Sequence, residues 1–179
     1  QVMPVPSNID LLDAGALPET ILTVYENIFN ISQFKENETV LIHGGSSGIG
    51  TTAISILKNY TKSIYVTAGT DEKCQKCIAL GATDAINYKT TDFEKYFEDK
   101  KIKLDIILDM IGGSYLKKNL KILNFKGRLT YIAALESIKS EINLLYVMTK
   151  QIKISGSTLR SRTPEEKGKI VKQVLKNIW

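Results

Sequence analysis

The stretch TVLIHGGSSGIG, residues 39–50, decides the fold of this chain. Residues 39–43 form a short, β-branched apolar run, which is typical of a buried strand. The glycine-rich turn 44–50 follows at once and opens a helix that we expect to end near Tyr60. A helix N-terminus presents unpaired N–H groups and the positive end of the helix dipole, so a turn in this place is suited to hold a diphosphate. The order of strand, glycine turn and helix therefore predicts a dinucleotide-binding unit.

The glycines of the turn follow the dinucleotide pattern GxGxxG with one departure. The three positions hold Gly45, Ser47 and Gly50, so a serine stands in place of the middle glycine. Serine is small and its hydroxyl can itself bond a phosphate, although a lone and imperfect motif is weak evidence. An ordinary glycine-rich connection is the alternative, which the preceding strand and the following helix disfavour.

Short apolar strands and helices alternate along the rest of the chain. Strands of about four to eight residues between helices of about ten indicate βαβ units, a parallel sheet and helices on both of its faces. Six strands fit an α/β, doubly wound parallel sheet, the Rossmann fold, better than a barrel, which needs eight units and ~250 residues. The opening stretch to Pro18 holds three of the four prolines and is expected to be extended. The expected strands are residues 39–43, 63–68, 85–88, 104–111, 128–133 and 153–159, and the expected helices are residues 19–29, the segment from the glycine turn to about 60, 70–80, 91–99, 114–124, 138–151 and 164–178.

Length and composition restrict the class of protein. A chain of 179 residues with 43% hydrophobic and 24% charged residues has the size and composition of one globular domain. No apolar run reaches the ~18 residues of a membrane helix, so no membrane partner is expected. The formal net charge of +5 admits an anionic ligand or a nucleic acid. No Lys/Arg block of ~5–8 residues is present, however, and a solvated, lysine-rich surface is the favoured interpretation.

The two cysteines and the first residues bear on where the chain belongs. Cys74 and Cys77 are too few for a disulfide framework, so a reducing, cytoplasmic setting is expected. They spell CxxC inside a predicted helix, and with one histidine in the chain a zinc ion lacks ligands, so two structural helix cysteines are the favoured interpretation. Residues 1–4 carry no signal region and no initiator Met, which indicates an interior piece of a longer protein.

The end of the second expected strand bears on the choice of cofactor. An NAD-binding protein usually has an acidic residue there, about 20 positions after the glycine turn, to bond the ribose 2′-OH. Residues 66–70 contain no acid, and Lys73 follows one turn into the next helix. A missing carboxylate and a nearby ammonium favour the 2′-phosphate of NADPH. Asp71 and Glu72 argue mildly against NADPH, although the helix dipole alone explains acidic residues in a first turn.

Seven short stretches, spaced in order along the chain, carry a resemblance to a known family. These are VLIHGGSSGIG (40–50), VTAG (66–69), LGA (80–82), INYK (86–89), DMIGGSY (109–115), GR (127–128) and GSTLRSR (156–162). Together they resemble the cofactor domain of zeta-crystallin-type quinone oxidoreductases, which are zinc-free members of the medium-chain dehydrogenase/reductase superfamily. The resemblance covers essentially the whole chain, and it implies an NADPH-dependent reductase of quinones or related electrophilic carbonyls, including enones.

The resemblance also implies roles for individual residues, all of them in cofactor binding. The turn that holds the pyrophosphate matches Ser46, Ser47, Gly48 and Ile49. The pocket for the 2′-phosphate matches Gly69, Thr70 and Lys73, with Tyr88 closing over that phosphate. The nicotinamide side matches Thr23, Ile111, Ile132 and Thr158. No residue of this chain is implied as an acid or base catalyst.

The same resemblance implies how the chain is organised. Residues 1–30 match the lead-in and connecting helix from a GroES-like catalytic domain that is missing here, and residues 31–179 match the NADPH-binding domain. The last expected strand, residues 153–159, matches the edge through which family members form homodimers. An exposed sheet edge also needs covering on general grounds, so a homodimer is expected.

Two other classes of protein remain as alternatives. A short-chain dehydrogenase/reductase shares the glycine pattern, and its Tyr-xxx-Lys pair is matched by Tyr96 and Lys100 and by Tyr146 and Lys150. Neither pair lies at the distance from the glycine turn that this class uses, and so lysine-rich a chain produces such matches by chance. A non-enzymatic module that binds nucleotides or RNA is the second alternative, although no RNA-binding motif is present. His43, at the end of the first strand, is interpreted as a structural histidine rather than an acid or base.

Overall fold

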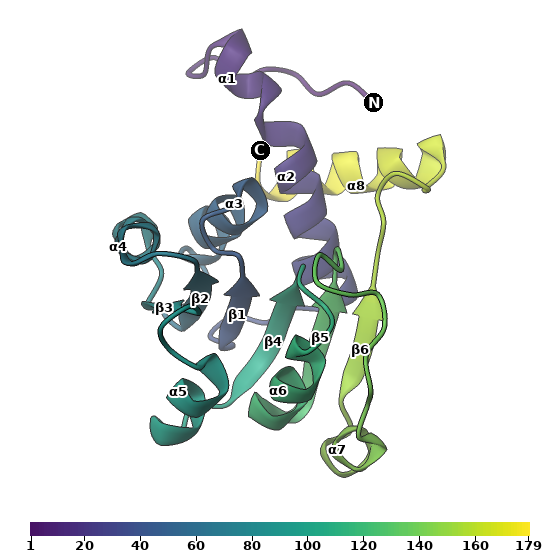
Figure 1. The fold of residues 1–179 in the computed structure, drawn as a ribbon. Helices are drawn as coiled ribbons and strands as arrows, with labels where there is room; N and C mark the ends of the chain where they lie inside the picture. The colour runs from purple at the N-terminus through teal and green to yellow at the C-terminus, as the bar shows by residue number, and fades with distance from the viewer.

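The computed structural model describes residues 1–179 and has at its centre one sheet of six parallel strands, in the order β3-β2-β1-β4-β5-β6 (Figure 1). This order and the parallel pairing confirm the predicted doubly wound fold. The strands are β1 (Val40–His43), β2 (Ile64–Ala68), β3 (Asp84–Asn87), β4 (Leu104–Asp109), β5 (Leu123–Tyr131) and β6 (Lys153–Gly156). The helices are α1 (Leu11–Gly15), α2 (Leu17–Val24), the π-helix η1 (Tyr25–Ile31), α3 (Gly48–Leu57), α4 (Asp71–Leu80), α5 (Phe93–Asp99), α6 (Tyr115–Ile122), α7 (Leu144–Lys150) and α8 (Pro164–Asn177).

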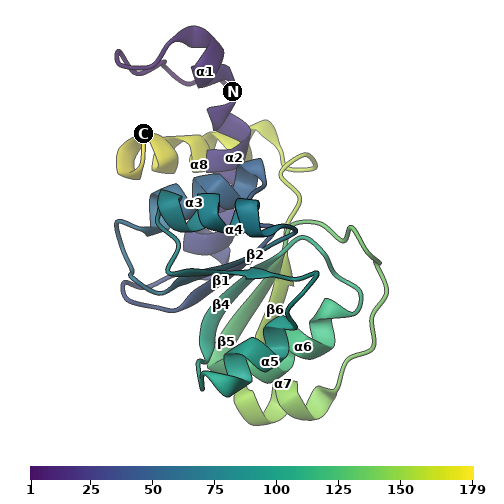
Figure 2. The same cartoon turned by 60° about the vertical axis from the view of Figure 1, so that its left-hand side comes forward.

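Helices cover both faces of the sheet and give each face its own apolar core. Figure 2 shows α2, α3, α4 and α8 on one face and α5, α6 and α7 on the other. Side chains along a strand point alternately to the two faces. In β1, Val40 and Ile42 belong to the core between the sheet and helices α2 and α3. Leu41 belongs to the core on the other face, between the sheet and helices α5 and α6. All three are fully buried, which is why the strand reads as a continuous apolar run.

The strand order reverses between β1 and β4, and this position determines where a ligand can bind. Chain connections leave β1 toward one side of the sheet and β4 toward the other, so the loops after these two strands diverge and leave a crevice at their carboxyl ends. The loop after β1 is the glycine turn, and the loop after β4 contains Gly112 and Gly113. Both predicted halves of a dinucleotide site therefore lie on the same edge of the sheet.

The N-terminal segment is more helical than its prolines suggest. Helix α1 forms before Pro18 because the Asp10 carboxylate caps it, accepting N–H bonds from Leu12 and Asp13 at 2.8 and 3.0 Å. Pro18 lies in the first turn of α2, where its missing N–H breaks no hydrogen bond. The two ends of the chain meet nearby, since the Trp179 indole Nε1 donates to the carbonyl oxygen of Pro4 at 2.8 Å.

The largest of the remaining differences from expectation are at three elements, and each has a local reason. The helix expected at residues 138–151 is reduced to α7, because Asn143 caps it and the residues before it are irregular. Strand β5 starts at Leu123 instead of residue 128, with a register shift against β4 and a left-handed Lys126 in between. Strand β6 ends at Gly156, after which Thr158 turns back to bond Ser161 at 2.6 Å.

None of the helices combines the length and the apolar character that crossing a membrane requires.

Candidate cofactor-binding site

The glycine turn after β1 lies so close to its surroundings that two of its positions have no room for a side chain. A Cβ on Gly45 would lie 2.5 Å from the Val66 Cβ on β2. A Cβ on Gly50 would lie 2.4 Å from the carbonyl oxygen of Gly44, so helix α3 rests directly on the backbone of the turn. Gly44 itself adopts a left-handed φ of +77°. The motif thus places the start of α3 against the end of β1.

The start of α3, at the carboxyl end of β1, has unpaired backbone donors. Ser47 is the N-cap, and its hydroxyl oxygen accepts the N–H of Gly50 at 3.0 Å. The backbone N–H groups of Ser46, Gly48 and Ile49 have no acceptor within the chain. The Ser47 hydroxyl proton is also available to a ligand. These donors and the positive end of the helix dipole make an anion-binding position of the kind that a pyrophosphate requires.

The four residues predicted to recognise the 2′-phosphate lie together at the carboxyl ends of β2 and β3. Thr70 is the N-cap of α4 and accepts the N–H of Lys73 at 3.2 Å. A Cβ on Gly69 would lie 2.8 Å from the Tyr88 hydroxyl, so the phenol ring covers Gly69. Tyr88 is 45% exposed. The Lys73 side chain is exposed and forms neither a hydrogen bond nor an ion pair.

The two acidic residues beside this cluster are already engaged. Asp71 accepts a hydrogen bond from the Asn87 side chain at 2.7 Å. Glu72 pairs with Lys76 at 2.7 Å, and this contact lowers the pKa of the Glu72 carboxyl. Neither acid has an ion pair with Lys73, so the ammonium of Lys73 remains available to an anionic ligand.

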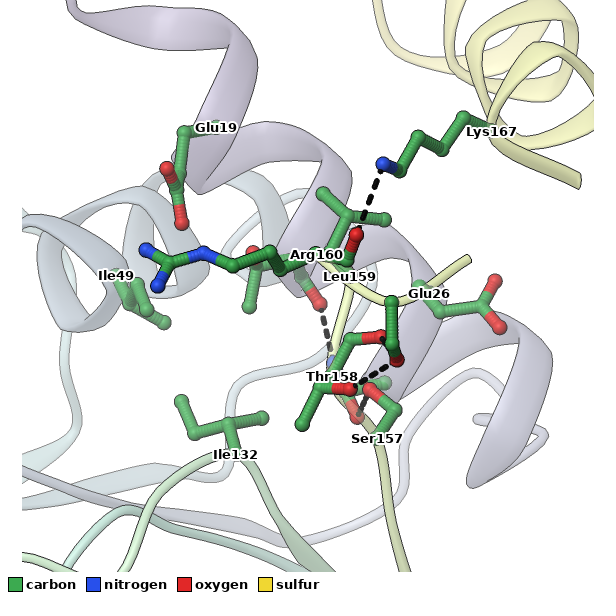
Figure 3. A pocket seen from close by; sticks show the side chains of 12 residues that line it. Glu19, Glu26, Ile49, Ile132, Ser157, Thr158, Leu159, Arg160 and Lys167 are labelled. Carbon is green, nitrogen blue, oxygen red and sulfur yellow. Dashed lines mark hydrogen bonds between the residues drawn. The ribbon is translucent and has the colours of Figure 1, made fainter. Parts of the chain in front are cut away.

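Thr23, Ile49, Ile132 and Thr158 line one cavity of about 620 Å³, although they come from four separate parts of the chain (Figure 3). A second hollow of about 730 Å³ adjoins it, shares Ile132 and Thr158, and extends to Gly112. Ile111 precedes Gly112 but lines neither space. The side-chain positions predicted for the nicotinamide side are therefore brought together, with the exception of Ile111, whose backbone N–H instead bonds Asp109 at 2.6 Å.

The cavity also contains an ion pair that sequence analysis missed. Glu26, whose side chain is 7% exposed, accepts a hydrogen bond from Asn30 at 2.7 Å and pairs with Arg162 at 2.5 Å. Its neighbour Asn27 donates to the carbonyl oxygen of Thr23 at 2.8 Å. Both Glu26 and Asn27 are buried because they lie in the π-helix η1, whose wider turns change which residues face inward.

Two basic residues at the cavity mouth were also missed. Figure 3 shows the Arg160 side chain extending across the cavity toward Ile49 and Glu19. The Lys167 ammonium donates to the carbonyl oxygen of Arg160 at 3.1 Å, which ties this loop to α8. The sequence run LRSR (159–162) could have indicated a basic site, because it holds two of the three arginines of the chain. The fold places this positive charge beside the start of α3.

His43 is a structural residue, as expected. It is fully buried, and each ring nitrogen has a partner: Nδ1 lies 3.1 Å from the Thr67 hydroxyl and Nε2 lies 2.9 Å from the Asn119 side-chain oxygen. Burial lowers the pKa of His43 more than the neighbouring Asp109 charge raises it. The imidazole is therefore neutral at neutral pH.

The two cysteines are buried in α4 and unbonded. Burial raises the pKa of both thiols, which disfavours the reactive thiolate form of Cys74 and Cys77. Nowhere in the chain do three His, Cys, Asp or Glu side chains come together in a way that could hold a metal ion.

The Tyr-xxx-Lys pairs of the short-chain dehydrogenase alternative lie away from the crevice. Tyr96 donates to Asp84, the first residue of β3, and Lys100 lies 2.9 Å from the Tyr96 hydroxyl. This position is at the amino end of the strand, whereas the crevice is at the carboxyl ends. Lys150 instead donates to three carbonyl oxygens at the end of α6, those of Leu120, Lys121 and Leu123, at 3.0, 2.8 and 2.9 Å.

Comparisons with known proteins agree with this geometry. The sequence pattern of a family described as "Zinc-binding dehydrogenase" matches residues 48–176. Human "Quinone oxidoreductase" is 32% identical over 169 residues, which are 92% of this chain and 50% of that protein. "Probable polyketide synthase 14" of Dictyostelium discoideum is 36% identical over 143 residues, 72% of this chain and 5% of that protein. The chain thus spans about half the length of the quinone oxidoreductase it matches.

Solved structures show the same fold. The quinone oxidoreductase of Thermus thermophilus, also solved in complex with NADPH, superposes with a TM-score of 0.79 at 27% identity, covering 97% of this chain and 55% of that one. The Escherichia coli quinone oxidoreductase complexed with NADPH gives 0.83 at 23% identity, covering 98% and 56%. These results confirm the resemblance stated from the sequence and favour neither a short-chain dehydrogenase nor an RNA-binding module.

Proposed function

The chain belongs to the zinc-binding dehydrogenase family, and from this premise we propose that it is the NADPH-binding domain of a quinone oxidoreductase-like enzyme. The proposed substrates are quinones or related electrophilic carbonyls. The observation that carries the proposal is the start of α3, at the carboxyl end of β1, where the N–H groups of Ser46, Gly48 and Ile49 have no acceptor within the chain. Quinone oxidoreductase relatives at about a third identity over nearly the whole chain support the same function.

Each part of the crevice is proposed to bind one part of NADPH. The turn Ser46–Ser47–Gly48–Ile49 would bind the pyrophosphate through backbone N–H groups and the Ser47 hydroxyl. Lys73 would pair with the 2′-phosphate, which Tyr88 would cover. Gly69 and Thr70 would shape this pocket from the end of β2 and the start of α4. The nicotinamide would lie in the cavity that holds Thr23, Ile132 and Thr158, with Ile111 beside it.

The chain's own contribution to the reaction is binding and orientation. Bound NADPH supplies a hydride from its nicotinamide ring. The apolar side chains of Ile49 and Ile132 exclude water from the cavity wall, and the Asn27–Thr23 hydrogen bond holds the opposite wall in place. No residue of the chain is assigned as an acid or base. We propose that a separate catalytic domain completes the pocket, with residues 1–30 as the connection to it, because the quinone oxidoreductase relatives are about twice as long.

The zinc ion of the family's description has no place in this proposal. The chain offers no cluster of three suitable side chains for a metal, so no step is assigned to zinc. The two buried, unbonded thiols support a reducing, cytoplasmic location as part of the same proposal.

A second substrate class is favoured by a specific observation. Parts of Dictyostelium discoideum polyketide synthases are up to 36% identical to this chain, and an enoyl reductase is among the solved structures with the same fold. Hydride addition to the double bond of an enoyl thioester would use the same cavity and cofactor as hydride addition to a quinone. Turnover of a quinone and of an enoyl thioester by the full-length protein distinguishes the two.

Replacing Lys73 by alanine tests the cofactor assignment. A hydrogen bond to a charged group contributes ~1.5–3 kcal/mol, so the affinity for NADPH is expected to fall roughly tenfold or more, while that for NADH stays the same. Lys95→Ala, at an exposed lysine on α5 that forms no ion pair, is the control and should leave both affinities unchanged. Fluorescence titration with each nucleotide measures the effect. An unaltered preference for NADPH in Lys73→Ala would contradict the assigned role.

We also propose that the protein forms a homodimer through the free edge of β6. This strand pairs only with β5, and α7 beside it buries none of its residues. Met148 on α7 is 71% exposed and Ile154 on β6 is 39% exposed. An unpaired strand edge flanked by apolar side chains is suited to pair with its own copy around a two-fold axis.

Replacing Ile154 by aspartate tests this interface. In a two-fold dimer the substituted residue is present twice at the interface, so the apolar burial is lost twice. The dimer dissociation constant is therefore expected to rise roughly 100-fold. Ile78→Asp, at an equally exposed isoleucine on α4, is the control and should leave association unchanged. Sedimentation velocity over a concentration series measures the equilibrium. A monomeric wild type, or a dimer that Ile154→Asp leaves intact, argues against this interface.

A further inference from the structure

A buried chain of hydrogen bonds runs beneath the crevice, from the glycine turn to the loop after β4. The N–H of Gly44 donates to the Thr67 hydroxyl at 3.3 Å, and this hydroxyl lies 3.1 Å from Nδ1 of His43. Nε2 of His43 lies 2.9 Å from the side-chain oxygen of Asn119, whose amide nitrogen donates to Asp109 at 2.9 Å. All four side chains are buried with at most 1% exposure. Neither ligand binding nor catalysis as described above uses them.

The Asp109 end of this hydrogen-bond network fixes the direction of its hydrogen bonds. Oδ1 of Asp109 accepts the N–H groups of Ile111 and Gly112, at 2.6 and 3.2 Å. The other carboxylate oxygen accepts from Asn119, because a carboxylate with three donors can only accept. Asn119 therefore presents its NH₂ group to Asp109 and its oxygen to His43. It follows that Nε2 of His43 carries the proton.

The direction of the hydrogen bonds at the Thr67 end of the network follows in the same way. With its proton on Nε2, the neutral imidazole of His43 accepts at Nδ1, so the Thr67 hydroxyl donates its proton there. The lone pairs of that hydroxyl remain free to accept the N–H of Gly44. One neutral tautomer thus satisfies every donor and acceptor, and the rings of Phe93 and Tyr115 pack against the imidazole at 4.9 and 4.8 Å and keep water away.

We propose that His43, Asn119 and Asp109 form a positioning relay that couples the phosphate-binding turn to the loop on the nicotinamide side, so that one network sets both halves of the dinucleotide site. Both ends of the relay are backbone N–H groups of residues in left-handed turns, Gly44 with φ +77° and Gly112 with φ +71°. If the hydrogen-bond direction reverses at Asp109, the directions at Asn119 and His43 have to reverse as well before the change reaches Thr67. The proposal rests on the proposed function, since it assigns both turns to one ligand.

The single histidine of the chain allows a direct spectroscopic test. The ¹⁵N shifts of its ring nitrogens identify the tautomer, and the wild type is expected to be neutral with the proton on Nε2 at pH 7. Asp109→Asn turns an acceptor into a donor toward Asn119, whose amide must then reverse. The His43 proton is consequently expected to move to Nδ1. A wild-type ring protonated on Nδ1, or a ring unaffected by Asp109→Asn, would overturn the relay.

A binding test asks whether the relay couples the two halves of the site. The probe is 2′-phospho-ADP-ribose, which carries the diphosphate and lacks the nicotinamide. The substituted residue in Asp109→Asn lies at the nicotinamide-side end of the network, yet we expect the variant to bind this probe at least about fivefold more weakly, within the usual range of coupling between sites. Thr67→Val, which keeps the side-chain shape but removes the hydroxyl, should shift the backbone amide signals of Ile111 and Gly112 at the opposite end. Thr67→Ser should restore both signals to their wild-type positions.

The outcomes separate the relay from the proposed function. Wild-type protein that binds neither NADPH nor the probe refutes the function itself. Wild-type protein that binds both, together with an Asp109→Asn variant that binds the probe as tightly as wild type, refutes the relay alone. Should Asp109→Asn fail to fold, Thr67→Val decides, because unshifted Ile111 and Gly112 signals in a folded Thr67→Val variant also refute the relay.

Discussion

Gly50→Ala is expected to lose about 3 kcal/mol of folding free energy, the upper end of the usual cost of overpacking, and to lose nucleotide binding with it. The new Cβ would lie 2.4 Å from the carbonyl oxygen of Gly44 and 2.6 Å from the carbonyl carbon and the Cα of Gly45. These are backbone atoms, so no rotamer change can relieve the contact. Either α3 moves away from the end of β1, or the turn is distorted. Because domains are typically stable by only ~5–15 kcal/mol, the folded population should fall steeply.

Gly48→Ala is the matched control for this prediction. It lies two residues earlier, in the first turn of α3, and its Cβ would meet only the Thr20 methyl group at 3.4 Å, an ordinary contact. Alanine also favours the helix over glycine. Urea unfolding followed by circular dichroism compares the two variants, with NADPH titration of whatever folds. Gly50→Ala with wild-type stability would mean that the turn is less tightly packed than described.

Arg162→Gln is expected to destabilise the protein by ~3 kcal/mol or more, because it leaves the Glu26 carboxylate buried without its partner. Glu26 retains only the Asn30 amide as a donor at 2.7 Å. The pair joins the loop after β6 to η1, so the variant should also loosen the cavity wall and weaken NADPH binding. Urea midpoints at constant m-value report the loss of stability.

The double variant Glu26→Gln/Arg162→Gln separates a buried charge from a lost contact. Removing both charges should recover most of the stability lost in Arg162→Gln, since neutral side chains carry a smaller desolvation penalty. Arg160→Gln, in the same loop but exposed and without an ion pair, serves as the control and should change stability little. If the double variant were no more stable than Arg162→Gln, the buried carboxylate would not be the cause.

The central part of the fold could be predicted because local and long-range signals agree there. Residues 39–50 combine a strand that is buried on both faces with a turn that only glycine can form, and the same logic holds for β2 and β4. Two helices whose bounds were predicted wrongly have a first residue that is set by a single hydrogen-bonded cap. Helix α1 depends on the Asp10 cap, and the start of α7 depends on Asn143. Neither residue stands out in a sequence with many polar side chains.

Residues of the candidate site could be predicted where the backbone of the glycine turn requires a particular residue type. They could not be predicted where helix packing decides which side chains face the cavity. Ser47 and Gly50 could be found from spacing, because the turn itself requires them. Glu26 and Asn27 could not, because their inward direction depends on the π-helical turns of η1. Tyr96 and Lys100 show the converse: the spacing of an active-site pair is present, yet the fold places it at the wrong end of β3.

The contact between Trp179 and Pro4 has a consequence for how the chain folds. These residues are separated by 175 positions, so their contact closes a long loop around the domain. Closing a long loop costs more conformational entropy than closing a short one, so we expect this contact to form late in folding. Emission from the sole tryptophan should therefore lag behind the far-ultraviolet circular dichroism signal in stopped-flow refolding, and report the final docking of the two ends.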